Sequence, residues 1–246
     1  MYTAVNLYEG GNVFKTAEGV PATIRIAREN VVATVQWLEQ LTGLNLVDNM
    51  LGSTGRKKTS GDLDLGIDET KITKDVLIQQ LLRKGIPAED IKKSGDSVHL
   101  KTPILGDKSN GYVQTDFMFG DPEFQKFSLV ADGDSAYKGV HRALLLASIA
   151  KAQGMKWSYK NGLVDRESNE TITKNPSEIA QNLINGTPAD MTSVESIIKK
   201  IKGLPNYEEL VKDAREAFER DKLTLPEDSV LPGTGAWYRQ FINKRV

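Results

Sequence analysis

The sequence predicts an α+β protein, in which a mixed-sheet domain (residues 1–120) is followed by a mostly helical domain (121–246). Three observations predict this class. Apolar residues alternate with polar ones in "DLDLGI" and "GYVQTDFMFGD", which is typical of half-buried strands. Other stretches of the chain carry apolar residues at helical spacing. After Pro122, apolar helical stretches become frequent and strand-like stretches become short.

Composition excludes several classes of site and of protein. The 246 residues can bury a core without disulfides, and the absence of cysteine excludes disulfides and thiolate zinc sites. His99 and His141 are the only histidines and lie far apart, so we interpret them as ordinary, partly exposed residues. The net charge of −1 disfavours binding to nucleic acid through bulk charge. With no membrane-length apolar run and no signal-peptide pattern, we expect a soluble, cytoplasmic protein without a membrane partner.

The elements of the first domain follow from periodicity and turn residues. Apolar residues at helical spacing predict a helix from Pro21 to Gly43, and "NLVDNML" predicts a short strand after it. The strand "DLDLGI" follows a basic loop, and its leucines and isoleucine should pack on a helix. Thr73 is the expected N-cap of the next helix. A hairpin around Gly95-Asp96 and the strand of residues 111–121 complete the domain.

The second domain should begin with the strongly apolar helix of residues 137–154. Short strands are expected around the Asn161-Gly162 turn, followed by a helix that Asn175 caps. Thr192 and Glu195 form the pattern of a capping box for the next helix. Residues 206–222 predict a charged helix with a narrow apolar stripe. The C-terminal tail should pack through Trp237 and Phe241.

Two carboxylates one residue apart open the strand "DLDLGI". Because side chains alternate along a strand, Asp62 and Asp64 should point to the same face, about 7 Å apart along the backbone. Two like charges side by side repel each other, and they are tolerated when water or a cation lies between them. Asp116 can supply a third carboxylate if its strand lies beside this one. Carboxylates and substrate phosphates are common ligands of Mg²⁺, so the three residues are candidate metal ligands.

The loop before this strand carries groups that suit phosphate. Gly52 permits a close backbone approach, and Ser53 offers a hydroxyl for phosphate oxygens. Arg56, Lys57 and Lys58 can offset further phosphate charge. The sequence therefore places together the parts needed to bind a metal–nucleoside triphosphate.

These residues resemble the signature of the DNA polymerase beta-like nucleotidyltransferase superfamily. That signature consists of a Gly-Ser, roughly ten residues, an acidic-x-acidic strand and a distant third acid, and residues 22–120 carry it here. The resemblance implies a palm-like fold and transfer of a nucleotidyl group from an NTP or dNTP, such as ATP, to a hydroxyl, with release of pyrophosphate. It implies Mg²⁺ (or Mn²⁺) as cofactor, with Asp62 and Asp64 ligating both metals and Asp116 ligating the metal that activates the acceptor.

The resemblance also implies that Ser53 contacts the terminal phosphates. The family often has Arg-Gly inside the loop, whereas Gly55-Arg56 stands in the reverse order here. A weaker similarity to the family X DNA polymerases follows the third acid, in "SLVADGDSAYKGVHRALLLASIAKAQGMKWSYKNGLV". The aromatic pair expected there before the glycine is replaced by Val130-Ala131, so sugar selectivity is not implied.

Several alternatives stay open at this point. The acceptor can be the 3′ end of a nucleic acid, a small molecule or a protein, and the chain can also be a nucleotide- or RNA-binding module without turnover. Arg142 is either a triphosphate ligand or a surface or ion-pairing residue. The lysines of the second domain are either a nucleic-acid surface or solvated positions. They are Lys156, Lys160, Lys199, Lys200 and Lys202.

Overall fold

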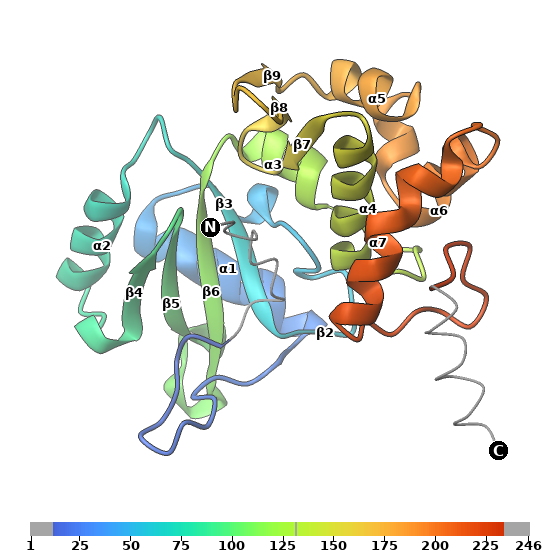
Figure 1. The fold of residues 1–246 in the computed structure, drawn as a ribbon. Helices are drawn as coiled ribbons and strands as arrows, with labels where there is room; N and C mark the ends of the chain where they lie inside the picture. The colour runs from blue at the N-terminus through green and yellow to red at the C-terminus, as the bar shows by residue number, and fades with distance from the viewer. Residues whose placement is uncertain (1–11, 131, 234–246) are drawn as a thin grey trace, which may run out of the picture. The chain divides into compact units, whose positions relative to one another are not determined.

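The computed structural model describes residues 12–130 and 132–233 and confirms an α+β protein (Figure 1). Its contacts divide the chain into two compact units, residues 1–126 and 127–246. A helix that the sequence analysis did not anticipate, α3 (Pro122–Leu129), contains the point of division. Asp121 caps its first turn by accepting hydrogen bonds from the N–H groups of Glu123 and Phe124.

A four-stranded mixed sheet organises the first unit in the order β3-β6-β5-β4. The strands are β3 (Asp62–Asp68), β6 (Tyr112–Gly120), β5 (Ser97–Pro103) and β4 (Ile91–Ser94). β3 and β6 run parallel, whereas β5 is antiparallel to both β6 and β4. A parallel pair needs a long crossover connection, and the chain between β3 and β6 provides it with a helix and a hairpin.

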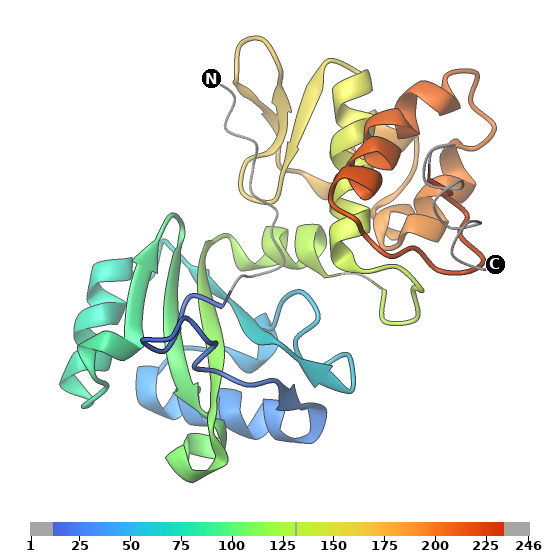
Figure 2. The same ribbon diagram turned by 60° about the horizontal axis from the view of Figure 1, so that its bottom comes forward.

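The two faces of this sheet differ in polarity. The leucines and isoleucine of β3 are buried together with Val113 and Phe117 of β6 in the core of the unit. α1 (Arg28–Thr42) and α2 (Lys74–Arg83) cover this apolar face (Figure 2). The alternate residues of β3, β6 and β5, which include Asp64, Asp116 and His99, lie on the other face. The two helices therefore pack on the apolar face, and the carboxylates lie on the face opposite to them.

Local signals predicted several element boundaries correctly. Thr73 caps α2 by accepting a hydrogen bond from the N–H of Val76, and the hairpin of β4 and β5 turns at Gly95-Asp96. Gly43 ends α1 in the left-handed conformation, with a φ of 72°. The expected start of α1 at Pro21 was wrong. The helix begins only at Arg28 because β1 (Ile26–Ala27) pairs antiparallel with β2 (Thr59–Ser60).

The expected strand at residues 45–51 was also wrong. Residues 47–49 form a turn of 3₁₀ helix, η1 (Val47–Asn49). The carboxylate of Glu39 accepts hydrogen bonds from the N–H groups of Leu46 and Val47, at 2.7 and 2.9 Å, and these contacts fold the backbone away from the extended form. Only Met50 pairs with β3, in an isolated bridge to Leu65.

Four helices and a small antiparallel sheet form the described part of the second unit after α3. The helices are α4 (Gly139–Ala152), α5 (Pro176–Ile184), α6 (Val194–Ile201) and α7 (Tyr207–Arg220), and the sheet order is β7 (Met155–Ser158), β8 (Gly162–Asp165) and β9 (Thr171–Thr173). The strands around Asn161-Gly162 and the Asn175 cap of α5 agree with the sequence analysis. Trp237 and Phe241 lie outside the described residues.

The capping box expected from Thr192 and Glu195 was wrong by one residue. Ser193 caps α6, and its hydroxyl accepts a hydrogen bond from the N–H of Ser196. Glu195 instead accepts hydrogen bonds from the hydroxyl of Ser135 at 2.8 Å and from the N–H of Ala136 at 3.0 Å. Glu195 therefore bonds to a segment about 60 residues earlier and not to the end of its own helix, where the local pattern had placed it.

His141, which was expected to be partly exposed, and Arg142, for which a surface position was one alternative, are both buried in the second unit. The guanidinium of Arg142 donates hydrogen bonds to the backbone carbonyls of Ser128, Val130 and Met191. Burial lowers its pKa to about 10, so it remains cationic at neutral pH. Because carbonyls from two segments of the chain accept hydrogen bonds from the guanidinium, Arg142 ties these segments together and is not a surface residue.

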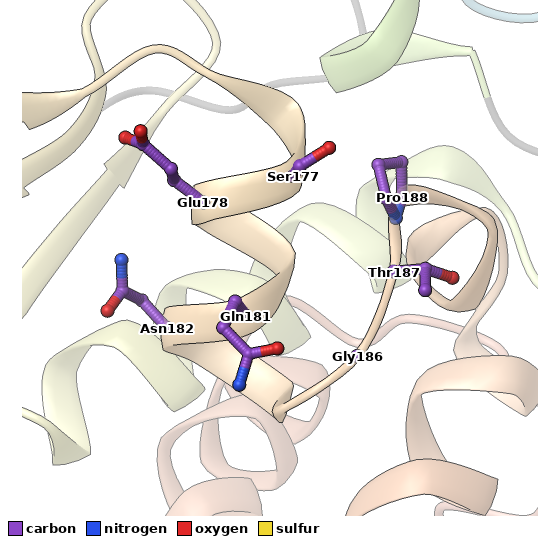
Figure 3. A pocket seen from close by; sticks show the side chains of 7 residues that line it. All are labelled: Ser177, Glu178, Gln181, Asn182, Gly186, Thr187 and Pro188. Atoms are coloured by element: carbon purple, nitrogen blue, oxygen red, sulfur yellow. The ribbon is translucent and has the colours of Figure 1, made fainter.

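A surface hollow in the second unit lies between α5 and the turn that follows it (Figure 3). Its lining consists of Ser177, Glu178, Gln181, Asn182, Gly186, Thr187 and Pro188. Glu178 is the one charged residue in this lining, and its carboxylate accepts a hydrogen bond from Thr173. The hollow thus offers no cationic side chain to phosphate. Among the described helices, none has the length and apolarity to span a membrane.

Candidate metal and nucleotide site

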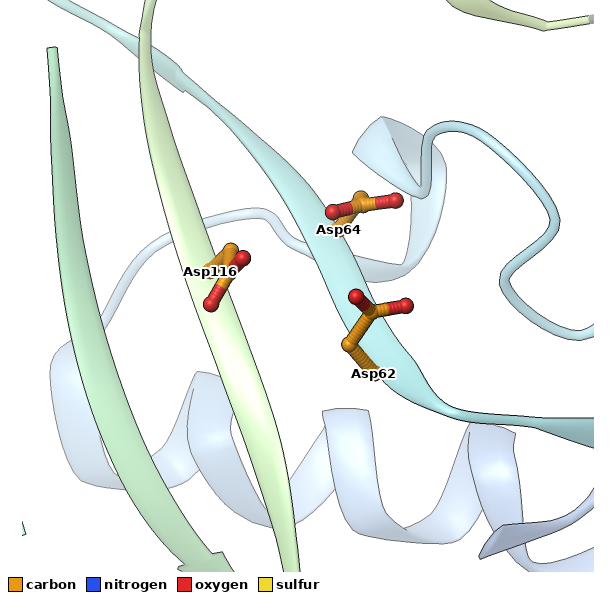
Figure 4. A group of neighbouring side chains, drawn as sticks. All are labelled: Asp62, Asp64 and Asp116. Carbon is orange, nitrogen blue, oxygen red and sulfur yellow. The ribbon is translucent and has the colours of Figure 1, made fainter. Parts of the chain in front are cut away.

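The structure brings Asp62, Asp64 and Asp116 together on the polar face of the first unit's sheet (Figure 4). One carboxylate oxygen of each lies within 4.8 Å of one from each of the others. The parallel register explains this convergence, because it sets Asp64 opposite Asp116 and Asp62 opposite Gln114. Within the described ranges, this is the one group of three or more acidic, His or Cys side chains placed to hold a metal ion.

The proximity of the three carboxylates disfavours the charged form of Asp64. Burial raises the pKa of Asp64 well above its ordinary value, and the charges of Asp62 and Asp116 raise it further. Asp64 reaches solvent in part, yet the sheet and the turn before it enclose most of its carboxylate. A divalent cation bound by these oxygens would remove the repulsion. The donor set is all carboxylate oxygen, which fits the hard ions Mg²⁺ and Mn²⁺.

The Gly52-Ser53 turn lies directly against Asp64. The N–H of Leu51 donates a hydrogen bond to the carbonyl of Asp64 at 2.8 Å, and the N–H of Asp64 donates to Thr54 Oγ1 at 2.9 Å. Gly52 has a φ of 55°, and a Cβ at this position would lie 2.6 Å from Asp64 Oδ2. The sequence predicts a close backbone approach at Gly52, and the structure shows that the carboxylate is what the backbone approaches.

Basic side chains surround this turn. Ser53, Arg56, Lys57 and Lys58 are exposed, as contact with a triphosphate requires. The guanidinium of Arg56 donates a hydrogen bond to the carbonyl of Gly52 at 3.3 Å, and partial burial lowers its pKa. Arg25, which the sequence analysis did not single out, donates hydrogen bonds to the side chain and the carbonyl of Thr59 at 3.0 Å and thereby fastens the end of the loop.

Two further residues that the sequence analysis did not assign to the site contact Asp116. His99 was expected to be partly exposed, but it is 8% exposed and its Nδ1 lies 2.8 Å from Asp116 Oδ1. Gln114 donates from Nε2 to the same oxygen at 2.9 Å. The register of the sheet brings both residues to the site. It sets His99 opposite Asp116 on the neighbouring strand, and strand alternation places Gln114 on the same face as Asp116, two residues before it.

The lysines considered for nucleic-acid contact belong to the second unit. Lys156 donates a hydrogen bond to Asn169, and Lys200 lies 3.8 Å from Asp190. Trp157 packs edge-on against Phe127, with ring centroids 6.2 Å apart, so it serves packing within its unit. The structure thus gives two of the lysines polar partners.

No protein-family model matches the chain, and a search of the curated proteins gave no match. The function is therefore inferred from the residues and their geometry.

Proposed function

We propose that the protein is a metal-dependent nucleotidyltransferase, which moves a nucleoside monophosphate from a triphosphate to an acceptor hydroxyl and releases pyrophosphate. The observation that supports it best is the convergence of three carboxylates within 4.8 Å beside the Gly52-Ser53 turn, whose serine is exposed. Carboxylates and a phosphate-binding turn are the two protein components that bind a metal–triphosphate complex. The resemblance of the sequence to polymerase beta-like nucleotidyltransferases agrees with this arrangement.

Each part of the site has a role in this proposal. Asp62, Asp64 and Asp116 would hold Mg²⁺ (or Mn²⁺), which supplies charge stabilisation to the oxygens around the reacting phosphorus. Gly52 and Ser53 would bind the non-reacting phosphates through backbone N–H groups and a hydroxyl. The exposure of Ser53 and the close approach of Gly52 to Asp64 support this role.

The basic loop would carry the rest of the triphosphate charge. Arg56 already lies at the Gly52 carbonyl, and Lys58 is exposed on the same loop. A guanidinium and an ammonium group both form charge-assisted hydrogen bonds with phosphate oxygens. These two side chains would therefore neutralise the pyrophosphate as it leaves.

The acceptor would approach from the side of Asp116. The segment before the Gly52-Ser53 turn contacts one side of β3, and β6 pairs with the other side. Asp116, on β6, is therefore farther from this turn in the strand order than Asp62 and Asp64, which lie on β3. A binding module without turnover needs no third carboxylate there, and this favours an enzyme. We propose the 3′ end of a nucleic acid as acceptor, because five exposed basic residues lie on the loop before the acidic strand and on the segment that pairs with its end. They are Arg25, Arg28, Arg56, Lys57 and Lys58.

The test is a transfer assay with each α-labelled NTP and dNTP, Mg²⁺ or Mn²⁺, and a panel of oligonucleotides, tRNA, small alcohols and proteins. The proposal expects metal-dependent transfer of label to one acceptor class, with equimolar pyrophosphate. Two results together would support a binding module instead. Wild type would bind triphosphate but transfer label to none of these acceptors, and Asp116→Asn would bind triphosphate as well as wild type does.

A further inference from the structure

We propose that His99 and Gln114 are positioning residues that fix the carboxylate of Asp116, and that the N-terminal segment takes part through the backbone of Val13. This inference rests on the proposed function, since it assigns Asp116 to a metal site. Neither residue belongs to the set of three carboxylates, and neither would touch substrate. Both act through Asp116 alone.

His99 lies on β5 and contacts residues on both neighbouring strands, β4 and β6. Its Nδ1 lies 2.8 Å from Asp116 Oδ1, and its Nε2 lies 2.7 Å from the hydroxyl of Ser94 on β4. A single tautomer satisfies both contacts: Nδ1–H donates to the carboxylate, and Nε2 accepts from the serine hydroxyl. Because an ionised carboxylate can only accept, Nδ1 is the nitrogen that donates to Asp116, and the contact with Ser94 holds the buried ring in that orientation.

Gln114 holds the same oxygen from within β6. Its Nε2 lies 2.9 Å from Asp116 Oδ1 and 3.2 Å from Oδ2, and its side chain is 2% exposed. Its Oε1 accepts a hydrogen bond from the N–H of Val13 at 2.9 Å. This backbone donor decides which end of the amide faces the carboxylate, since a flipped amide would set N–H against N–H.

The segment around Val13 is itself anchored to the sheet. The side chain of Lys92 on β4 donates to the carbonyl of Val13, and its ammonium lies 5.1 Å from the centre of the Phe14 ring. The N–H of Ala22 donates to the carbonyl of Phe14 at 2.9 Å, which folds the segment back on itself. The donor to Gln114 is thus held in place by contacts on both sides of it.

These contacts leave the two oxygens of Asp116 unequal. Oδ1 accepts two short hydrogen bonds, whereas Oδ2 has one longer contact with Gln114. Two donors on Oδ1 restrict rotation of the carboxylate and leave Oδ2 with the greater remaining capacity to bind a cation. Partners of this kind orient metal-ligating carboxylates, and their loss typically weakens metal affinity or activity about 10- to 100-fold.

The test measures Mn²⁺ affinity of the full chain by electron paramagnetic resonance, with a non-transferable triphosphate present. His99→Leu and Gln114→Met should each weaken Mn²⁺ binding about 10-fold or more. His99→Asn should retain most of the affinity, because its amide can donate from about the position of Nδ1. Equal affinity in all variants would overturn the positioning role.

A matched control separates positioning from loss of fold. Thr102 and Thr115 share a buried hydrogen bond of 2.7 Å on the opposite face of the same two strands. Thr102→Val removes that bond and should lower thermal stability while leaving Mn²⁺ affinity unchanged. If Thr102→Val weakens Mn²⁺ binding as much as His99→Leu does at the same loss of stability, the role of His99 is only structural.

A double-mutant cycle gives the decisive outcome. In the Asp116→Asn background, His99→Leu should cause no further loss of Mn²⁺ affinity, because the ligand through which it acts is gone. An additive loss would overturn the proposal. The readout needs no transfer reaction, so a positive cycle stands even if no acceptor is found. Transfer that is lost in Asp116→Asn but normal in His99→Leu and Gln114→Met would refute the positioning role and leave the proposed function intact.

Discussion

Gly52 and Asp64 are in such close contact that the Gly52 backbone leaves no room for a side chain. A Cβ at Gly52 would lie 2.6 Å from Asp64 Oδ2, a distance that real Cβ contacts essentially never show. The turn and the acidic strand are therefore matched to each other, and a phosphate bound at the turn would lie beside the metal ligands.

The first prediction concerns this contact. Gly52→Ala should displace the Asp64 carboxylate or the turn, and shifts of about 1 Å at a reacting centre can cost about 100-fold in rate. Gly55→Ala is the matched control, because Gly55 also has a positive φ, of 70°, but its Cβ would meet Val31 at an ordinary 3.5 Å. Transfer rates of the two variants, each corrected for thermal stability, test this. Equal losses would show that only backbone strain matters.

The second prediction concerns the carboxylates. Asp62→Asn, Asp64→Asn and Asp116→Asn should each lower the transfer rate by about 1000-fold, which corresponds to about 4 kcal/mol of transition-state stabilisation. Asp68→Asn changes an acid on the same strand whose carboxylate instead accepts hydrogen bonds from Thr70, so its rate should stay near wild type. Near-normal turnover of Asp116→Asn would contradict the three-carboxylate site.

The third prediction concerns the pH dependence of stability without metal. The pKa of Asp64 is raised in the folded protein, mainly by burial and then by its two acidic neighbours, above the ordinary 3.8 of an unfolded chain. The folded state therefore binds more protons between these two pKa values, and stability falls as the pH rises through the folded pKa. Asp64→Asn removes the ionisable group and with it this loss of stability. In EDTA, the melting temperature of Asp64→Asn should therefore exceed that of wild type at neutral pH. This difference should shrink as the pH is lowered toward about pH 4.

Asp68 supplies a control of opposite sign for that measurement. Hydrogen bonds from Thr70 lower its pKa, so its contribution is present above the ordinary pKa and is lost as the pH falls. Asp68→Asn should therefore gain nothing at neutral pH. Added Mg²⁺ should raise the melting temperature of wild type and cancel the advantage of Asp64→Asn. An advantage that is independent of pH and Mg²⁺ would rule out charge repulsion as its cause.

The fourth prediction concerns the exposed hydroxyl of the turn. Ser53→Ala should raise the dissociation constant of the triphosphate about 10-fold, as expected for one hydrogen bond to a charged group, and change the rate of saturated enzyme little. Isothermal titration with a non-transferable triphosphate and single-turnover kinetics separate the two effects. Unchanged affinity would remove Ser53 from the phosphate site.

The fifth prediction compares two candidate surfaces for a nucleic-acid acceptor. Charge reversal of Lys57 and Lys58, on the loop before the acidic strand, should weaken oligonucleotide binding and flatten its salt dependence. Charge reversal of Lys156 and Lys160, in the second unit, should have a smaller effect, because Lys156 donates to Asn169 within its own unit. Salt-dependent anisotropy titrations measure both slopes. The reverse order of effects would move the acceptor surface to the second unit.

The parts of the site that are local in sequence were predictable. Strand alternation predicted that Asp62 and Asp64 lie on one face of β3. The alternation of residues 111–121 likewise predicted a strand that carries Asp116, which could lie beside β3. The close backbone approach at Gly52 was predictable because few residues other than glycine tolerate a positive φ. The hairpin at Gly95-Asp96 followed from turn chemistry alone.

The parts of the fold and of the site that depend on pairing between residues far apart in the sequence could not be predicted. His99 reaches Asp116 only because β5 pairs with β6 in one register, and a shift by one residue would turn its ring to the core. Glu39 folds residues 46–47 into a turn from a helix several residues away, which overrides their strand-like sequence. Likewise, the pairing of β1 with β2 ended the helical pattern before Arg28.

The most direct test of the metal–nucleotide site is the Mn²⁺ bound per chain with a non-transferable triphosphate, compared between wild type, Asp64→Asn and Asp68→Asn. The site predicts that wild type and Asp68→Asn bind Mn²⁺ and triphosphate together, each ligand tightening the other, and that Asp64→Asn loses this coupling. Triphosphate binding that is the same with and without Mn²⁺, or equal coupling in Asp64→Asn and Asp68→Asn, would contradict it.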